Sequence, residues 1–181
     1  MNIVEEVAQI FGTLGAISML CSNWQKTRRK ILFCLIFDGL FYFIQYILLK
    51  AYTGAFTNLI SIVRVLTFNK KGTNDFFKKN YILYIILLLY IFIGIYTYDG
   101  IISLLPTIAT VIYTIALWQD DTKVIRYGSI MMFAMWLLYN IIVQAYISAI
   151  VEGILLIGTL ISIIKFDIIN KKTKAIKLLK R

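Results

Sequence analysis

Long apolar runs separated by short polar breaks follow one another along most of the chain. A run of about 17–20 apolar residues, at ~1.5 Å per helical residue, is long enough to cross a bilayer core of ~30 Å. The pattern therefore predicts seven membrane-spanning helices, at Val4–Cys21, Ile31–Leu49, Ala51–Phe68, Tyr81–Tyr98, Gly100–Trp118, Tyr127–Val143 and Ile147–Phe166. Breaks as short as Lys50 or Asp99 require the neighbouring helices to turn back tightly.

The second and third runs together form Ile31–Phe68 and contain polar residues that do not suit a lipid-facing helix. Asp38, Asn58 and Arg64 all lie inside these two runs. Ionisable residues in membrane helices almost always face the protein interior or a water-filled cavity, because exposure to hydrocarbon is costly. We therefore expect this helix pair at the centre of the protein, with its polar side chains turned toward other helices or a wet cavity.

Basic residues gather in every second break, and this sets the expected orientation. They follow the first, third, fifth and seventh runs, at Lys26, Arg28, Arg29, Lys30, Lys70, Lys71, Lys78, Lys79, Lys123, Arg126 and, in the tail, Lys165, Lys171, Lys172, Lys174, Lys177, Lys180 and Arg181. The other side has only Lys50, with the acidic residues Glu5, Glu6 and Asp99. Because positively charged loops stay in the cytoplasm, we expect a multi-pass membrane protein with its N-terminus outside and its C-terminus in the cytoplasm.

Composition agrees with a membrane environment and changes how the net charge is understood. The 181 residues are 60% hydrophobic with a mean hydropathy of +0.81, which is far from the average of soluble domains. Much of the net charge of +10 comes from the alternate loops and the tail INKKTKAIKLLKR, which we expect to lie on an anionic inner leaflet. The tail has no aromatic residues, so we expect no nucleic-acid partner. The acidic start MNIVEEVAQIF predicts no cleavable signal peptide.

An internal repeat emerges when the sequence is shifted by 94 residues without a gap. Two dipeptides at helix boundaries then coincide: Trp24-Gln25 with Trp118-Gln119, and Ala51-Tyr52 with Ala145-Tyr146. Since one span links the copies, both have the same orientation, and parallel repeats in transporters place the site between the halves. The predicted fold class is all-α: a polytopic membrane protein whose seven transmembrane helices form two parallel three-helix repeats joined by a linker helix (3-1-3). The predicted parts are residues 1–69 (first bundle), 70–99 (cytoplasmic loop and linker helix), 100–166 (second bundle) and 167–181 (basic cytoplasmic tail).

The repeat aligns a polar residue in the third helix of one copy with a polar residue in the third helix of the other. The second helix of each copy carries an aromatic residue. Asn58 aligns with Glu152, and sixteen residues before each lies a ring, Tyr42 or Trp136. A hydrogen-bonding group and a flat ring from each half would form a pseudo-symmetric, substrate-binding pocket for a small polar solute. The alternative is structural: Asn58 and Glu152 hydrogen-bond across helices, and the two rings only pack.

Glu152 lies about six residues inside its span, where an ionised carboxylate is costly. We therefore expect this side chain to be in water, paired or protonated. Proton coupling, cation binding and a fixed structural role all stay open for it.

Two further pairs are candidates for conformational roles. Asp38 and Arg64 lie in the cytoplasmic halves of their helices and are predicted to meet as a structural or gating ion pair, although Arg64 could also snorkel or contact solute. Pro106, the chain's only proline, falls inside the fifth run and aligns with Gly12. Proline removes a backbone hydrogen bond and kinks a helix. Pro106 and Gly12 are thus candidate hinges, with a static kink as the alternative.

Other residue types narrow the chemistry. Histidine, the commonest metal ligand, is absent, and we expect no metal site and no cofactor. Cys21 and Cys34 lie in apolar surroundings and are expected to pack. The sequence contains no recognisable nucleophile–base pair or metal-ligand cluster, so we do not expect an enzyme. Trp24 and Trp118 each end a helix at the expected cytoplasmic boundary and are interpreted as interfacial anchors.

Three segments closely resemble the YgjV family of bacterial inner-membrane proteins: LLKAYTGAFTNLISIVR, LLPTIATVIYTIALWQ and WLLYNIIVQAYISAIVEGI. The resemblance covers nearly the whole chain and implies the bacterial inner membrane. That family is distantly similar to the SWEET, SemiSWEET and PQ-loop (MtN3-like) group, which shares the 3-1-3 helix plan. In sugar transporters of that group an asparagine on each third helix and an aromatic on each second helix line the pocket, which implies that role for Tyr42, Asn58, Trp136 and Glu152. Glu152 stands where the second asparagine would be, and Trp-Gln stands where the PQ dipeptide would be.

Together these features predict a transporter or facilitator of a small polar solute, working by alternating access between two pseudo-symmetric triple-helix bundles. The expected partners are that solute and a lipid bilayer with an anionic inner leaflet, and homo-oligomerisation is left open. The alternative is a non-transporting membrane scaffold or receptor with the same fold, which predicts a centre filled with side chains. The solute, the coupling ion and the direction of flux are not indicated by the residues.

Overall fold

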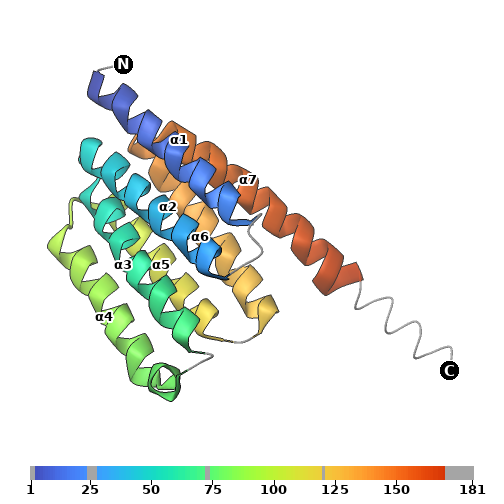
Figure 1. Cartoon of the computed structure of the whole chain (residues 1–181). Helices are drawn as coiled ribbons and strands as arrows, with labels where there is room; N and C mark the ends of the chain where they lie inside the picture. The colour runs from blue at the N-terminus through green and yellow to red at the C-terminus, as the bar shows by residue number, and fades with distance from the viewer. Residues whose placement is uncertain (1–2, 24–27, 72–73, 120, 170–181) are drawn as a thin grey trace, which may run out of the picture.

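The computed structural model describes residues 3–23, 28–71, 74–119 and 121–169, and these are helical almost throughout (Figure 1). Seven α-helices make up this part of the chain: α1 (Ile3–Asn23), α2 (Arg28–Leu48), α3 (Tyr52–Lys70), α4 (Asn80–Tyr96), α5 (Leu104–Trp118), α6 (Thr122–Ile142) and α7 (Tyr146–Ile163). Two 3-10 helices, η1 (Asp75–Lys78) and η2 (Ile101–Ser103), precede α4 and α5, and a π-helical segment, η3 (Ile164–Ile169), follows α7. For the described residues, the prediction of an all-α fold with seven helices is confirmed.

The start of α5 differs from the sequence prediction in a way that changes the role of its proline. Gly100 has a φ of 85°, and Ile101–Ser103 forms a 3-10 helix before α5 begins at Leu104. Pro106 therefore lies in the first turn of α5 and not in its interior. The N–H groups of a first turn have no partner within the helix, so proline costs no hydrogen bond there. The expected interior break at Pro106 is corrected accordingly.

Six of the helices form a closed ring. α1 packs against α2 and α7, α3 packs against α2 and α5, and α6 packs against α5 and α7. In Figure 1, α1 and α7 lie side by side and run in the same direction, so the ring closes between the first and the last helix. Consequently α1 begins and α7 ends at opposite ends of the bundle.

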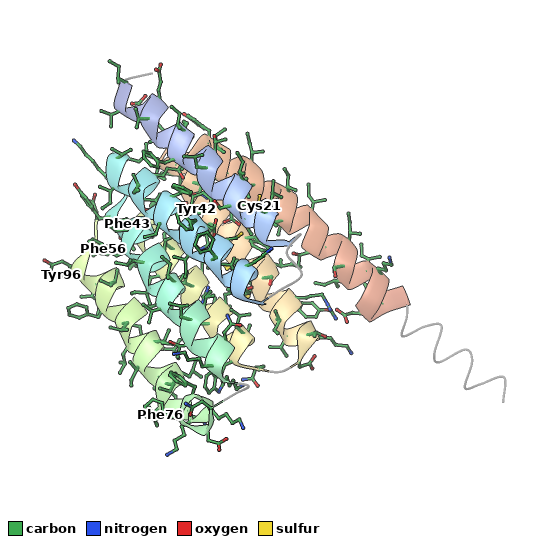
Figure 2. All side chains as sticks on the ribbon, in the orientation of Figure 1. Cys21, Tyr42, Phe43, Phe56, Phe76 and Tyr96 are labelled. Carbon is green, nitrogen blue, oxygen red and sulfur yellow. The ribbon has the colours of Figure 1, made fainter. Side chains whose placement is uncertain are left out.

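The remaining helix, α4, lies outside the ring against α3 and α5 (Figure 1). The Tyr90 hydroxyl of α4 shares a 2.9 Å hydrogen bond with the Ser61 hydroxyl of α3. Gly94 lies so close to Thr107 of α5 that a Cβ there would be 2.6 Å from the Thr107 Oγ1. The opposite face of α4 is apolar and exposed, with Ile85, Leu88, Phe92, Ile95 and Tyr96 on it. Figure 2 shows Tyr96 at this periphery.

The protein has an apolar exterior and an interior that contains many polar side chains. Its largest fully buried side chains, among the described residues, include Gln45, Thr53, Thr57, Thr114 and Asn140. Every helix, by contrast, carries Ile, Leu, Phe, Tyr, Val or Met side chains that are more than a third exposed. Water does not tolerate so much contiguous apolar surface, whereas hydrocarbon does. This inverted distribution is that of a membrane protein.

Length and composition support membrane crossing for a subset of the helices. Four segments are long and apolar enough: Ile3–Cys21, Ile101–Trp118, Thr122–Ile142 and Tyr146–Ile163. Phe33–Leu48 and Asn80–Tyr96 are apolar but shorter. α3 is less apolar than these, since it carries Asn58 and Arg64.

Two tight turns share one backbone conformation. Lys50, between α2 and α3, has a φ of 57°, and Gln144, between α6 and α7, has a φ of 60°. The following N–H returns to the carbonyl five residues earlier, from Ala51 to Tyr46 and from Ala145 to Asn140, at 2.8 Å in both cases. This is the Schellman ending of a helix, whose left-handed position is usually a glycine. Lys50 and Gln144 occupy that position here.

We predict that valine at these two left-handed positions destabilises the protein and that glycine does not. Glycine adopts a positive φ freely, whereas a β-branched residue pays about 1–2 kcal/mol. Lys50→Val and Gln144→Val should therefore unfold at a lower temperature than Lys50→Gly and Gln144→Gly, which should match or exceed the wild type. Thermal unfolding in detergent measures the difference. Equal melting temperatures for the valine and glycine variants would contradict the turn conformation.

Candidate functional site

A cavity of about 460 Å³ lies inside the ring of six helices. One end of its lining is formed by Tyr46 and Ser148, close to the two tight turns. The lining continues to Phe68, Asn69 and Leu117, within two residues of the ends of α3 and α5. We call the first end the tight-turn end. The second is the basic end, because it carries Lys70, Lys71, Lys78 and Lys79.

The four residues predicted to bind solute, Tyr42, Asn58, Trp136 and Glu152, all line this cavity. Each lies six residues from the helix end at a tight turn, in α2, α3, α6 and α7 respectively. At ~1.5 Å per residue, all four lie about 9 Å from the same end of the bundle. In Figure 2, Tyr42 is seen within the bundle, in contrast to the outlying Tyr96 and Phe76. The structure thus brings the four residues to one level of one cavity.

In the described part of the chain, neither polar residue of this level hydrogen-bonds across helices. The Asn58 Nδ2 donates to the Gly54 carbonyl of its own helix at 2.9 Å. The Glu152 Oε2 is buried and has no hydrogen-bond partner in the described chain. The structural alternative considered for Asn58 and Glu152, a hydrogen bond across helices, is therefore not made here.

Asp38 and Arg64 line the same cavity, but within the described residues they do not form an ion pair with each other. Arg64 is only 6% exposed, and its Nη1 donates to the Thr114 hydroxyl at 3.0 Å. Its Cζ lies 5.2 Å from the centre of the Tyr113 ring. The Arg64 Nε and the Asp38 Oδ1 are buried without hydrogen-bond partners among the described groups. Asp38 and Arg64, which were predicted to pair, therefore line one cavity but form no salt bridge with each other in the described chain.

Side chains from α2, α6 and α7 close the cavity at the tight-turn end. The Tyr46 hydroxyl donates to the Asn140 Oδ1 at 2.6 Å. Beside it, the Ser148 hydroxyl donates to the Gln45 Oε1 at 2.6 Å. The ring of Tyr46 lies 5.6 Å from that of Trp136, between centroids. We call Gln45, Tyr46, Gly54, Tyr139, Asn140 and Ser148 the closing cluster.

Contacts within the closing cluster are related by the 94-residue shift. Tyr46 and Asn140, which bond each other, are equivalent positions. The Gly54 N–H donates to the Tyr139 hydroxyl at 3.2 Å. Under the shift Gly54 corresponds to Ser148 and Tyr139 to Gln45, so this bond is the counterpart of the bond from Ser148 to Gln45. The position shared by Gln45 and Tyr139 therefore contacts the position shared by Gly54 and Ser148 twice, each time between one copy of the repeat and the other.

Sequence reasoning missed this cluster because its equivalent positions hold different residues. Gln45 aligns with Tyr139 and Tyr46 with Asn140, so a search for identities passes over them. A signal was nevertheless present. The second helix of each repeat, α2 or α6, has two consecutive hydrogen-bonding residues shortly before its tight turn.

Gly12 has a packing role in the structure. α1 continues through it without a break, and a Cβ on Gly12 would overlap the Gln45 amide. Glycine is therefore needed for the close approach of α1 to Gln45. Pro106 is fully buried at the start of α5. The hinge role of the two residues stays a prediction.

Trp118 is buried at the basic end and does not anchor the protein in the lipid interface. It is 8% exposed, and its Nε1 donates to the Asn80 Oδ1 at 3.2 Å. The Lys71 Nζ donates to its carbonyl at 2.7 Å and lies 4.4 Å from the centre of its ring. The interpretation of Trp118 as an exposed anchor is therefore wrong, because these neighbours and Phe68 cover it. Trp24 lies outside the described residues.

The cavity offers the groups that bind a small polar molecule. It holds two carboxyl groups, a guanidinium, two amides, hydroxyls and several aromatic rings. Ligand sites combine apolar and aromatic walls with a few polar groups of this kind. Within residues 3–23, 28–71, 74–119 and 121–169, no group of three Cys, Asp or Glu residues could hold a metal ion.

Comparison with known proteins identifies a family model that the chain matches. The family model Imp-YgjV, described as a bacterial inner membrane protein, matches residues 6–169. No curated protein and no solved structure matches the chain. The matched range includes the whole closing cluster and every residue of the cavity lining.

Removing one hydroxyl tests the closing cluster. Tyr46→Phe keeps the ring but leaves the buried Asn140 Oδ1 without its donor, so we predict a loss of stability of about 1–3 kcal/mol. Tyr96→Phe removes the same group from a ring that is 77% exposed on α4, and should change little. Unfolding of both purified variants in detergent provides the measurement. Similar stability in the two variants would argue against the bond.

Proposed function

Because the chain belongs to the YgjV family of bacterial inner membrane proteins, we propose that it carries a small polar solute across that membrane by alternating access. The observation that supports this most is the cavity of about 460 Å³ inside the helix ring. Polar and ionisable side chains lie on its wall among apolar ones, it is closed at the tight-turn end, and its lining extends to the basic end. A cavity of this size and polarity within an apolar exterior is typical of a solute site. Tyr42, Asn58, Trp136 and Glu152 would bind the solute.

The proposal includes a 3-1-3, SWEET-like arrangement, in which α1–α3 and α5–α7 are parallel repeats and α4 is the linker. The shared conformation of the tight turns at Lys50 and Gln144 supports it. The contact of α3 with α5 also has its counterpart in the contact of α7 with α1.

The closing cluster supports the same arrangement most directly. Reciprocal contacts between equivalent positions are the mark of a two-fold axis. Such an axis would pass between Tyr46 and Asn140, along the membrane normal. Motion of one parallel repeat against the other around a site at their interface is a known route to alternating access.

We further propose that all seven helices cross the membrane and that the basic end faces the cytoplasm. Lys70, Lys71, Lys78 and Lys79 gather at that end, whereas Lys50 is at the other. Positive charge favours the cytoplasmic side and contact with anionic lipid. The N-terminus is then outside, and the cavity in this structure is closed toward the outside. Homo-oligomerisation is left open by the proposal.

A non-transporting scaffold or receptor is the second candidate function. It predicts a centre filled by side chains, as in an ordinary helix bundle. The cavity and the unpartnered Asp38 and Glu152 oxygens of the described chain favour transport instead. Buried polar groups are normally satisfied, and exceptions usually mark a functional need. We do not propose an enzymatic role.

Solute flux in proteoliposomes tests this function. A panel of labelled small metabolites should include one that enters in a protein-dependent way. Asn58→Ala and Glu152→Ala should each reduce that uptake by about tenfold, since leaving a buried polar group without its partner costs about 1–3 kcal/mol.

Thr159→Ala serves as the matched control for these variants. Thr159 lies on α7 with Glu152, but its hydroxyl bonds the Leu155 carbonyl of its own helix at 2.8 Å and does not line the cavity. Its uptake should equal that of the wild type. Undiminished uptake in correctly inserted Asn58→Ala and Glu152→Ala would sink the proposed site.

A further inference from the structure

Three ionisable side chains line the cavity without pairing with one another. Asp38 and Glu152 supply carboxyl groups, and Arg64 supplies a guanidinium. The ion pairs formed among the described residues involve none of the three. Opposite charges that share a cavity wall and remain apart are suited to a ligand that carries both charges itself.

Each of the three also has a buried atom without a hydrogen-bond partner in the described chain: the Asp38 Oδ1, the Arg64 Nε and the Glu152 Oε2. Arg64 is the most informative of them. It is 6% exposed, and its contacts, the Thr114 hydroxyl and the Tyr113 ring, bring no carboxylate. A buried cation without an anionic partner is costly. A negatively charged group in the cavity would remove that cost.

The charges lie at different levels of the cavity. Counted from the helix ends at the tight turns, Glu152 is the sixth residue along, Asp38 the tenth and Arg64 the twelfth. At ~1.5 Å per residue these positions are about 9, 15 and 18 Å deep. The Glu152 carboxyl is thus nearest the closing cluster, and the guanidinium is nearest the basic end.

We infer that the cavity takes a zwitterionic solute, with its ammonium group directed to Glu152 and Asp38 and its carboxylate to Arg64. This rests on the proposed function, for which it names the class of solute. Such a molecule supplies a counter-charge to all three groups, which a neutral sugar or a simple amine does not. The rings of Tyr42 and Trp136 share the level of Glu152 and are placed for cation–π contact with the ammonium group.

Binding selectivity of the wild-type protein tests this assignment. Isothermal titration in detergent compares 4-aminobutyrate, n-butylamine, butyrate and 1-butanol, which share a four-carbon skeleton, and adds L-valine as a zwitterion with adjacent charges. At least one zwitterion should bind about tenfold or more tightly than the amine and the carboxylate, because each charge-assisted contact contributes 1.5 kcal/mol or more. The alcohol should not bind. Equal affinity for amine and zwitterion, or no binding of either zwitterion, overturns the assignment.

Variants separate the two ends of the ligand. Arg64→Gln should weaken zwitterion binding by about tenfold and leave n-butylamine binding unchanged. Glu152→Gln should weaken both, and Thr159→Ala should affect neither. Undiminished zwitterion binding by Arg64→Gln overturns the role of the guanidinium, and the wild-type selectivity above remains decisive if a variant fails to fold.

Failure of this inference is distinguishable from failure of the proposed transport. Flux of a neutral or purely cationic solute, without zwitterion binding, would overturn the zwitterion assignment and leave the transporter intact. Selective zwitterion binding without any flux in proteoliposomes would support the assignment and contradict transport.

Discussion

The hydrogen bond from Tyr46 to Asn140, with the two reciprocal contacts beside it, is the constraint on which the rest of the structure depends. It joins α2 to α6 at the buried centre of the ring, where no bulk water competes for the hydroxyl or the amide. These contacts set how closely the two sides approach at the tight-turn end, and so where the cavity begins. The Gln45 Nε2 and the Asn140 Nδ2 have no partners among the described groups. The closed end is therefore held by a few strong bonds and not by a saturated network, and the proposed opening of the cavity requires that only those few bonds break.

The inverted distribution of polarity explains why such a cavity can persist. In water, apolar collapse would favour filling the centre with leucine and isoleucine, but in hydrocarbon those residues gain nothing by moving inward. Hydroxyl and amide side chains do gain, because hydrocarbon offers them no other partner. Residues such as Thr57, Thr114 and Gln45 therefore occupy the interior, and many of the aliphatic residues face outward. α3, which carries Asn58 and Arg64, is the helix in which this tendency is clearest. The same physics that folds the protein also leaves polar groups around a central space.

Much of the fold could be predicted because long apolar runs separated by short polar breaks mark the helices to within a few residues. The common level of Tyr42 and Glu152 also followed from the repeat, since sequence distance from a helix end sets the distance from the end of the bundle. The hydrogen-bond partner of Arg64 could not be predicted, because the Arg64 side chain is oriented by its bond to Thr114 on α5, fifty residues away. Pro106 was misplaced because a positive φ at a single earlier residue delays the start of its helix. Errors of this kind arise where the outcome depends on a neighbouring element or one backbone angle, neither of which leaves a periodic signal.

The most direct test of this account is a pair of distances measured by double electron–electron resonance in lipid nanodiscs. One pair of spin labels, at Lys50 and Gln144, reports the tight-turn end, and a second pair, at Lys70 and Ile164, reports the basic end. In the wild type the first pair should give one short distance. In Tyr46→Phe, a longer distance should appear at the tight-turn end together with a shorter one at the basic end. Distances that stay unchanged at both ends, or lengthen at both, would contradict a closing cluster that governs access to the cavity.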